Sequence, residues 1–300
     1  SGKTRVLTFK VAYLLKQGVD PFSILALTFT NKAAKEMKDR VENLVGTDAK
    51  SVWMGTFHSI FARLLRFDGH HLGYQDNFTI YDTDDAKGVL KTVISNLELD
   101  PKVYVVNQVM SRISAAKSQL ISADEYAQHP EVIEHDAASG KREIFMIYKA
   151  YQETLFRSSA MDFDDIIFNF HLLITRFPEV LAKYQRRFRY ILIDEFQDTN
   201  KAQYSIIKKL SEPENNLCVV GDDAQSIYAF RGANIENILG FRSDYPNYKL
   251  FKLEQNYRST SHIVEASNSV IKKNRSQIDK NVWTDNGDGE LIKVIQTTTD

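Results

Sequence analysis

The sequence predicts an α/β fold in which a mostly helical insertion interrupts a parallel sheet. Near both ends of the chain, short apolar runs alternate with stretches of helical periodicity, the pattern of a parallel sheet covered by helices on both faces. Between about residues 82 and 184 this changes to helical periodicity with capping signals and no convincing strand. Several apolar runs end in carboxylate or amide residues, and ligands bind at the carboxyl ends of parallel strands.

Four or five apolar runs have the length and composition of buried strands. They are residues 24–29, 52–57, 190–193, 217–220 and 248–253. Residues 31–44 predict a helix capped by Asn31, and its apolar stripe consists of Ala33, Ala34, Met37, Val41 and Leu44.

Capping signals predict three helix starts within the insertion. The first lies at Asp82, the second is a capping box of Ser122 with Glu125, and the third is Asp162 with an acid three residues on. We expect a helix over 259–274, a turn at 286–289 and a strand over 291–295, which together begin a further domain.

These segments divide the chain into four parts. We expect a sheet domain built from residues 1–84 and 185–256, a helical insertion at 85–184, and the start of a second domain at 257–300. A chain of 300 residues suits two or three domains.

Composition excludes several classes of protein. No apolar run is long enough to span a bilayer, and no secretory pattern opens the chain. Cys218 is the one cysteine, which rules out a disulfide framework and favours a cytoplasmic location. With a net charge of −1, any nucleic-acid binding must rely on local basic surface and stacking groups. The chain opens inside a motif and without Met, so we expect residues to precede Ser1.

The first four residues match the end of a phosphate-binding loop. Ser1, Gly2, Lys3 and Thr4 fit G-x-x-x-x-G-K-[ST], in which the lysine reaches phosphate and the hydroxyl holds Mg²⁺ at a helix N-terminus. The tetrapeptide alone is weak, because its glycine-rich upstream part is not in the sequence.

A stronger signal is the apolar strand that ends in Asp194 and Glu195. At the carboxyl end of a parallel strand, Asp194 would hold Mg²⁺ and Glu195 would orient and deprotonate an attacking water. The alternative is a strand-end turn with two solvated acids.

Two further segments follow predicted strands. Gln225 is suited to sense a γ-phosphate, and the next residues interleave Tyr228 and Phe230 with Arg231, which suits stacking on bases and pairing with phosphate. The alternative is a packed loop with both aromatics in the core. Arg258 would act as an arginine finger across a cleft, or else form a surface ion pair.

The order of the motifs resembles that of the UvrD/PcrA/Rep helicase family. The matching segments are DEFQDTN at 194–200, GDDAQSIY at 221–228, QNYRST at 255–260, LTFTNKAA at 27–34 and GTFHS at 55–59. The resemblance covers essentially the whole chain. It implies a RecA-like P-loop NTPase domain with a helical insertion, followed by the start of a second RecA-like domain.

The resemblance also implies roles for single residues. On the ATP side it implies Lys3 on phosphate, Thr4 and Asp194 on Mg²⁺, Glu195 as base, Gln225 as γ-phosphate sensor, Arg258 as arginine finger and Tyr257 stacked on adenine. On the DNA side it implies base stacking by Phe57, Tyr228 and Phe230, and strand contacts by Thr28, Asn31, His58 and Arg231. Phe230 stands where relatives commonly have Trp, and the later motifs, including a second arginine finger, are not in the sequence.

The implied activity is ATP-dependent movement along single-stranded DNA, 3′ to 5′ by resemblance, in DNA repair, replication or recombination. The implied partners are single-stranded DNA, single/double-strand junctions, and repair or replication proteins, at the nucleoid. The residues leave open a helicase–nuclease of the RecB/AddA type, a motor that mainly displaces proteins from DNA, and a structural ATP-binding module. We expect this piece alone to be inactive, because it lacks groups that complete the cleft.

Overall fold

The computed structural model describes residues 2–212, 214–225, 236–274, 278 and 280–296. Its main sheet has four parallel strands in the order β2-β1-β5-β6. They are β1 (Ile24–Thr28), β2 (Trp53–Thr56), β5 (Tyr190–Ile193) and β6 (Leu217–Val219). Four of the predicted strands are thereby confirmed, and because all four are parallel, their carboxyl ends meet at one edge of the sheet.

Alternate side chains of β1 serve the cores on the two faces of the sheet. Ile24 and Ala26 pack with α1 (Lys3–Lys16) and α2 (Asn31–Val45). Leu25 and Leu27 pack on the other face, in a core built largely by four helices. These helices are α3 (Phe57–Asp68), α8 (Phe163–Arg176), α9 (Pro178–Arg187) and α10 (Lys201–Ser211). This period of two is that of a strand buried on both faces, and it confirms the predicted α/β class.

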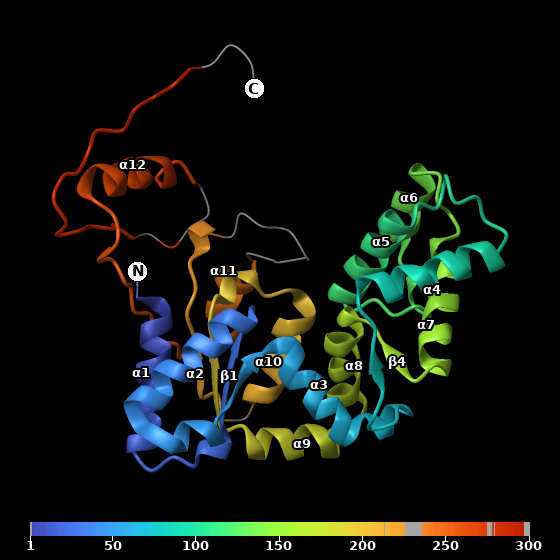
Figure 1. Cartoon of the computed structure of the whole chain (residues 1–300), viewed down its shortest axis with the longest axis horizontal. Helices are drawn as coiled ribbons and strands as arrows, with labels where there is room; N and C mark the ends of the chain where they lie inside the picture. Colours follow the sequence, from blue (N-terminus) through green and yellow to red (C-terminus); the bar gives the residue numbers. More distant parts are fainter. Residues whose placement is uncertain (1, 213, 226–235, 275–277, 279, 297–300) are drawn as a thin grey trace.

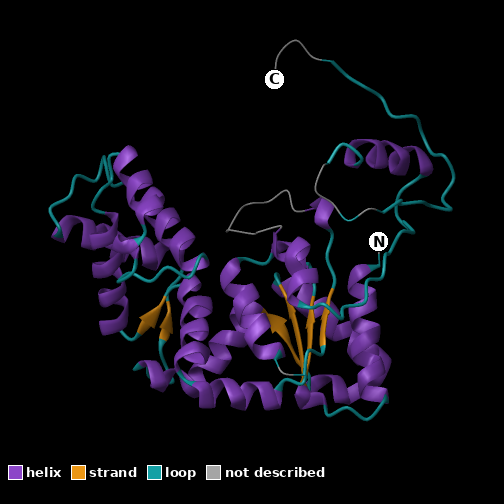
Figure 2. Cartoon of the chain, turned by 180° about the vertical axis from the view of Figure 1, so that it is seen from behind, coloured by secondary structure: helices purple, strands orange, loops and turns teal. Residues whose placement is uncertain are grey.

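The insertion builds a hydrophobic core of its own. Of the stretch predicted as the insertion, residues 85–184, this core takes α4 (Thr83–Asn96), α5 (Val106–Ser118), α6 (Pro130–Ala138) and α7 (Ile144–Arg157), whereas α8 and α9 pack in the core of the main sheet. Figures 1 and 2 show these four helices gathered in a lobe beside the main sheet, with α8 between the two. The expectation that this stretch holds no strand is wrong in one detail. β4 (Ala160–Met161) pairs in parallel with β3 (Thr79–Ile80), because the chain leaving the insertion lies beside the chain entering it and runs in the same direction.

Of the four predicted helix caps, two are confirmed, one is wrong, and one forms its hydrogen bonds without opening an α-helix. Asp82 and Asp162 cap α4 and α8, each in a capping box. The cap of α2 is Thr30, whose hydroxyl accepts a hydrogen bond from the Ala33 N–H at 3.1 Å, so Asn31 is the first helical residue. Ser122 and Glu125 do form reciprocal hydrogen bonds, but only a 3-10 turn, η4 (Tyr126–Gln128), follows them, and α6 starts later at Pro130.

The last part of the described chain contains α11 (Glu236–Asp244) and α12 (Ser261–Ile271), the latter inside the predicted range 259–274. The strands predicted at 248–253 and 291–295 are wrong, since neither range forms one in the part of the chain that is described. A strand needs a neighbour to take its backbone hydrogen bonds. The one isolated bridge described after α11, Gln255 with Trp283, lies outside both predicted ranges. Within those ranges Phe251 and Val294 are 81% and 92% exposed, so neither side chain is packed against a neighbour strand. The remaining short 3-10 helices are η1 (Pro21–Ser23), η2 (Gly46–Ser51), η3 (Gly69–Leu72), η5 (Phe196–Asp198) and η6 (Asp223–Gln225).

A buried charge cluster joins the insertion to the sheet domain. Lys117 of α5 is 1% exposed, and its Nζ lies 2.6 Å from Asp162 Oδ2 and 2.8 Å from Asp165 Oδ1 of α8. The Tyr151 hydroxyl of α7 donates to Asp162 at 2.8 Å. Burial alone would lower the pKa of Lys117, but the charges of both aspartates outweigh it and hold that pKa well above its ordinary value.

Replacing Lys117 by Met should therefore destabilise the protein strongly, because it leaves two buried carboxylates without their cation. We expect a loss of about 3–5 kcal/mol in the free energy of unfolding, measured by urea denaturation. The matched control is Lys149→Met, which removes an exposed 3.8 Å pair with Asp124 and should cost less than about 1 kcal/mol. Equal losses in the two variants would contradict the role of the cluster.

Candidate nucleotide-binding site

The carboxyl edge of the main sheet faces the start of α1. Gly2 adopts a φ of 93°, a left-handed conformation that favours glycine, and α1 begins at the next residue, Lys3. The free backbone N–H groups and dipole of a helix N-terminus make this a place where an anion is stabilised.

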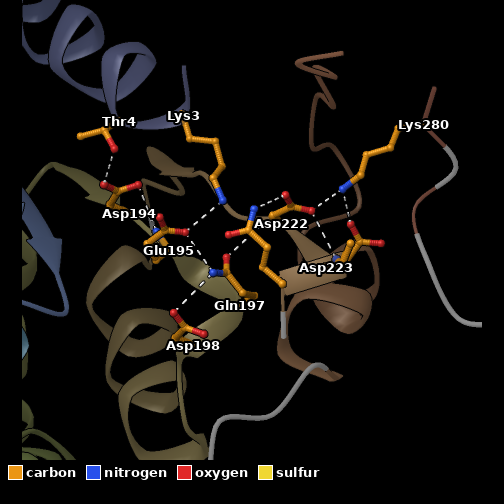
Figure 3. A network of polar contacts seen from close by, with 11 residues as sticks. Lys3, Thr4, Asp194, Glu195, Gln197, Asp198, Asp222, Asp223 and Lys280 are labelled. Atoms are coloured by element: carbon orange, nitrogen blue, oxygen red, sulfur yellow. Dashed lines mark hydrogen bonds and ion pairs between the residues drawn. The ribbon is translucent and has the colours of Figure 1, made fainter. Parts of the chain in front are cut away.

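Two residues at the start of α1 pair with the two carboxylates that follow β5 (Figure 3). Lys3 Nζ lies 3.0 Å from Glu195 Oε2, and the Thr4 hydroxyl donates to Asp194 Oδ2 at 3.0 Å. The four side chains that the sequence placed in one site are therefore adjacent, although they are about 190 residues apart in the chain.

The backbone after β5 explains how consecutive carboxylates reach the same helix end. Successive side chains of a strand point to opposite faces, but Glu195 has a φ of 50°, in the left-handed region. The turn brings its side chain to Lys3 while Asp194 contacts Thr4. Asp194 is 2% exposed, and burial raises the pKa of its carboxyl, with the Thr4 hydrogen bond acting against the shift. A non-glycine residue held at such a φ is strained, and such strain clusters at functional sites.

A second layer of polar contacts joins Glu195 to the segment after β6. Gln197 Nε2 donates to Glu195 Oε2 at 2.9 Å, and Gln197 Oε1 accepts from the Asp222 N–H at 2.9 Å. Gln225 Nε2 donates to Asp222 Oδ2 at 2.6 Å. The predicted sensor Gln225 is therefore two hydrogen-bonded residues away from Glu195.

The C-terminal segment contributes a lysine to the same layer. Lys280 pairs with Asp222 and, at 2.9 Å, with Asp223, and the Ile278 N–H donates to Asp223 Oδ2 at 2.6 Å. Burial alone would raise the pKa of Asp222, but the hydrogen bond and charge of Lys280 bring it below its ordinary value. Sequence reasoning missed Lys280, because nothing in its own neighbourhood indicates where it folds back.

The predicted ATP-side residues of the second domain lie in the same C-terminal segment. Tyr257 is 67% exposed and its hydroxyl donates to Gln255 Oε1 at 2.7 Å. Arg258 is exposed, and its backbone N–H donates to Asn256 Oδ1. Figures 1 and 2 show the segment around α12 at the same end of the molecule as the start of α1.

The residues predicted to contact DNA are placed less uniformly. Phe57 is 1% exposed and its ring packs 5.3 Å from Phe29 and 5.9 Å from Phe61. The ring is enclosed in this conformation, and base stacking by Phe57 stays a prediction. Thr28 is also 1% exposed, and its hydroxyl makes no hydrogen bond within the described structure, so its contact with a DNA strand stays a prediction.

His58 and Asn31 fit the prediction better. Asn31 is exposed at the start of α2. The ring of His58 stacks on Phe163, with centroids 4.2 Å apart, and Phe163 is 54% exposed at the start of α8. The sequence analysis did not single out Phe163, whose contact with His58 appears only in the fold. Ser1, Tyr228, Phe230 and Arg231 lie outside the described residues.

The fold and the pairing of a helix start with strand-end carboxylates define a RecA-like P-loop α/β protein. The family model of the UvrD/REP helicase N-terminal domain matches residues 1–246, and that of the UvrD-like helicase C-terminal domain matches residues 251–300. The chain therefore belongs to the UvrD/REP helicase family.

Curated relatives agree with this membership. The chain is 48% identical over its full length to a Staphylococcus epidermidis protein named ATP-dependent DNA helicase PcrA. It is 47% identical to proteins of the same name from Bacillus subtilis and Staphylococcus aureus, over 97% and 100% of its length. It spans about 40% of the length of these relatives.

Lys280 should hold the C-terminal segment against the loop after β6. Replacing it by Met should speed hydrogen exchange of the Ile278 amide on the order of tenfold, because hydrogen bonds to charged groups are worth roughly 1.5–3 kcal/mol. Exchange followed by mass spectrometry or NMR would measure this. The control is Lys272→Met, at an exposed residue after α12, which should leave the exchange rate of the Ile278 amide unchanged. An unchanged exchange rate in Lys280→Met would contradict the role of its ion pairs.

Proposed function

We propose that the protein is an ATP-driven motor that moves along single-stranded DNA, of which this chain supplies the first nucleotide-binding domain. The observation that carries the proposal is the pairing of Lys3 and Thr4 with Glu195 and Asp194 at the carboxyl edge of the sheet. A cation, a hydroxyl and two carboxylates at a helix N-terminus are the groups that phosphoryl transfer requires.

The residues present fit a magnesium ion. Mg²⁺ takes oxygen ligands and usually keeps waters and phosphate oxygens beside one or two protein groups. The Thr4 hydroxyl and the Asp194 carboxylate, 3.0 Å apart, are two such groups. Among the described residues no cluster of three or more His, Cys, Asp or Glu side chains could hold a metal by itself. When bound, the ion would neutralise charge on the phosphates.

In the whole protein, residues of this chain would carry out the steps of hydrolysis. The Lys3 ammonium leaves Glu195 and pairs instead with the β- and γ-phosphates of ATP. This leaves the Glu195 carboxylate free to take a proton from a water whose oxygen attacks the γ-phosphorus. The bond to the β–γ bridging oxygen breaks, and ADP and phosphate leave. Gln225 contacts the γ-phosphate, Arg258 stabilises the transferring group from across the cleft, and Tyr257 stacks on adenine.

DNA would be held at the same end of the sheet domain. We assign the grip to Asn31, to His58 with its neighbour Phe163, and to Tyr228, Phe230 and Arg231. Stacking and phosphate contacts do not depend on sequence, as movement along a strand requires. The substrates would be single-stranded DNA and junctions, with 3′ to 5′ movement, among repair or replication proteins at the bacterial nucleoid.

Two other readings receive less support. The matched relatives are named as helicases, and no observation favours the helicase–nuclease alternative. The intact group of Lys3, Asp194, Glu195 and Gln225 argues against a purely structural ATP-binding module.

No described helix is long and apolar enough to cross a membrane. Residues 1–300 alone should be inactive, because Arg258 acts only when a second domain closes the cleft.

The full-length protein should hydrolyse ATP, and single-stranded DNA should stimulate the rate strongly. Glu195→Gln should lower the stimulated kcat by about 100-fold or more, since general bases contribute roughly 10²–10⁴-fold. The matched control is Glu36→Gln, at a half-exposed glutamate of α2, which should keep the rate within about twofold. Hydrolysis indifferent to DNA, or unchanged by Glu195→Gln, would contradict the proposal.

Phe163→Ala should weaken binding of single-stranded DNA. A base stacked on an aromatic ring is worth roughly 1–3 kcal/mol, so the Kd measured by fluorescence anisotropy should rise between about 5-fold and 150-fold. Phe22→Ala is a suitable control, because Phe22 is 51% exposed in η1, just before β1 and hence at the opposite edge of the sheet. Equal Kd values for the two variants would remove Phe163 from the DNA-binding surface.

A further inference from the structure

Gln197 is a buried polar residue to which neither the sequence motifs nor the proposed chemistry gives a role. It is 2% exposed and lies in η5, two residues after the proposed base. A buried amide costs free energy unless its groups are hydrogen-bonded, and both ends of this amide are. The two ends contact different parts of the site.

The amide nitrogen faces the base. Gln197 Nε2 donates to Glu195 Oε2 at 2.9 Å and lies 3.4 Å from Asp198 Oδ2. Lys3 Nζ binds the same Glu195 oxygen at 3.0 Å. When Lys3 moves to phosphate, Gln197 is the side chain that still holds the Glu195 carboxylate in place.

The amide oxygen faces the loop after β6. It accepts the Asp222 N–H at 2.9 Å, and the Asp222 carboxylate in turn accepts hydrogen bonds from Gln225 and Lys280. Asp222 therefore joins the proposed γ-phosphate sensor and the C-terminal segment to one end of Gln197. Figure 3 shows Gln197 between Glu195 on one side and Asp222 on the other.

The packing around Gly221 supports the same connection independently. A Cβ atom placed on Gly221 would lie 2.9 Å from Gln197 Oε1 and 3.1 Å from Ile238 Cδ1. Both distances are shorter than ordinary contacts. The loop can therefore approach the Gln197 amide this closely only because residue 221 is glycine and has no side chain.

We propose that Gln197 is a positioning residue that ties the Glu195 carboxylate to the loop 221–225, so that the base is aligned only when this loop is in place. The inference rests on the proposed function, since it concerns the same hydrolysis. A change at the sensor, or at Lys280, moves Asp222 and through the Gln197 amide moves Glu195. The base therefore responds to the γ-phosphate contact and to the second domain without touching either.

The test compares three variants of the full-length protein in DNA-stimulated ATP hydrolysis. Gln197→Met keeps the volume and removes both hydrogen bonds. Gln197→Glu keeps the acceptor for Asp222 but places a carboxylate against Glu195. Gly221→Ala displaces the loop end of the amide without changing Glu195 or Gln197 itself. Each should lower kcat between about 10-fold and 100-fold, the loss that misplacement of a catalytic group by about 1 Å causes. KM for ATP should stay within about threefold, since Lys3 and Thr4 are unchanged.

A matched control separates positioning from general stability. Gln203 is also a buried glutamine, 5% exposed, and its side chain accepts the Asn200 N–H at the start of α10, away from Glu195. Gln203→Met should lower the melting temperature but keep kcat. The double variant Gln197→Met with Gly221→Ala should lose no more activity than the worse single variant, because both break one connection.

The outcomes separate the two proposals. Wild-type kcat in Gln197→Met, an equal loss of kcat in Gln203→Met, or additive losses in the double variant would overturn the role of Gln197 and leave the proposed function standing. If Gln197→Met fails to fold, Gln197→Glu and Gly221→Ala carry the same comparison. A wild-type protein without DNA-stimulated hydrolysis, or one indifferent to Glu195→Gln, would overturn the proposed function and this inference with it.

Discussion

The contact between the start of α1 and the end of β5 is the constraint on which the rest of the site depends. Lys3 and Thr4 reach Glu195 and Asp194 only because α1 begins at the carboxyl edge of the sheet, next to a central strand. The buried faces of α1 and β1 fix the helix against the sheet, and the left-handed turn at Glu195 brings two consecutive carboxylates to one helix end. Carboxylates on a strand two positions further from β1 in the sheet would lie roughly 10 Å further away, because neighbouring strands are about 4.8 Å apart.

Around that contact the polar groups form a continuous chain rather than separate pairs. It runs from Thr4 through Asp194 and Glu195 to Gln197, and from there to Asp222 and Lys280. Hydrogen bonds linked in this way polarise one another, so displacement of one member changes the bonds of its neighbours. In the proposed motor, this would be the physical route by which nucleotide and the second domain influence the same carboxylate.

The sequence predicted the parts of this structure that depend on local pattern. Runs such as residues 190–193 are short, apolar and followed by acidic residues, so one run predicts both a buried strand and the carboxylates at its end. The runs at 248–253 and 291–295 look similar, but strand formation depends on a partner that composition does not reveal. The role of Phe57 stays a prediction, because the sequence does not distinguish an aromatic residue that binds bases from one in the core, and here the ring packs against Phe29 and Phe61. Lys280 was missed because its partners are 57 and 58 residues earlier in the chain.

The strand order carries a consequence for how the protein folds during synthesis. β1 lies between β2 and β5, and β5 follows β1 by more than 160 residues because the helical lobe is inserted between them. At a translation rate of about 5–20 residues per second, one edge of β1 waits on the order of ten seconds or more for its partner. During that interval an apolar strand with unpaired backbone groups is open to association with other chains. The lobe has a core of its own, so its packing does not depend on β5, whereas the pairing of one edge of residues 24–28 does.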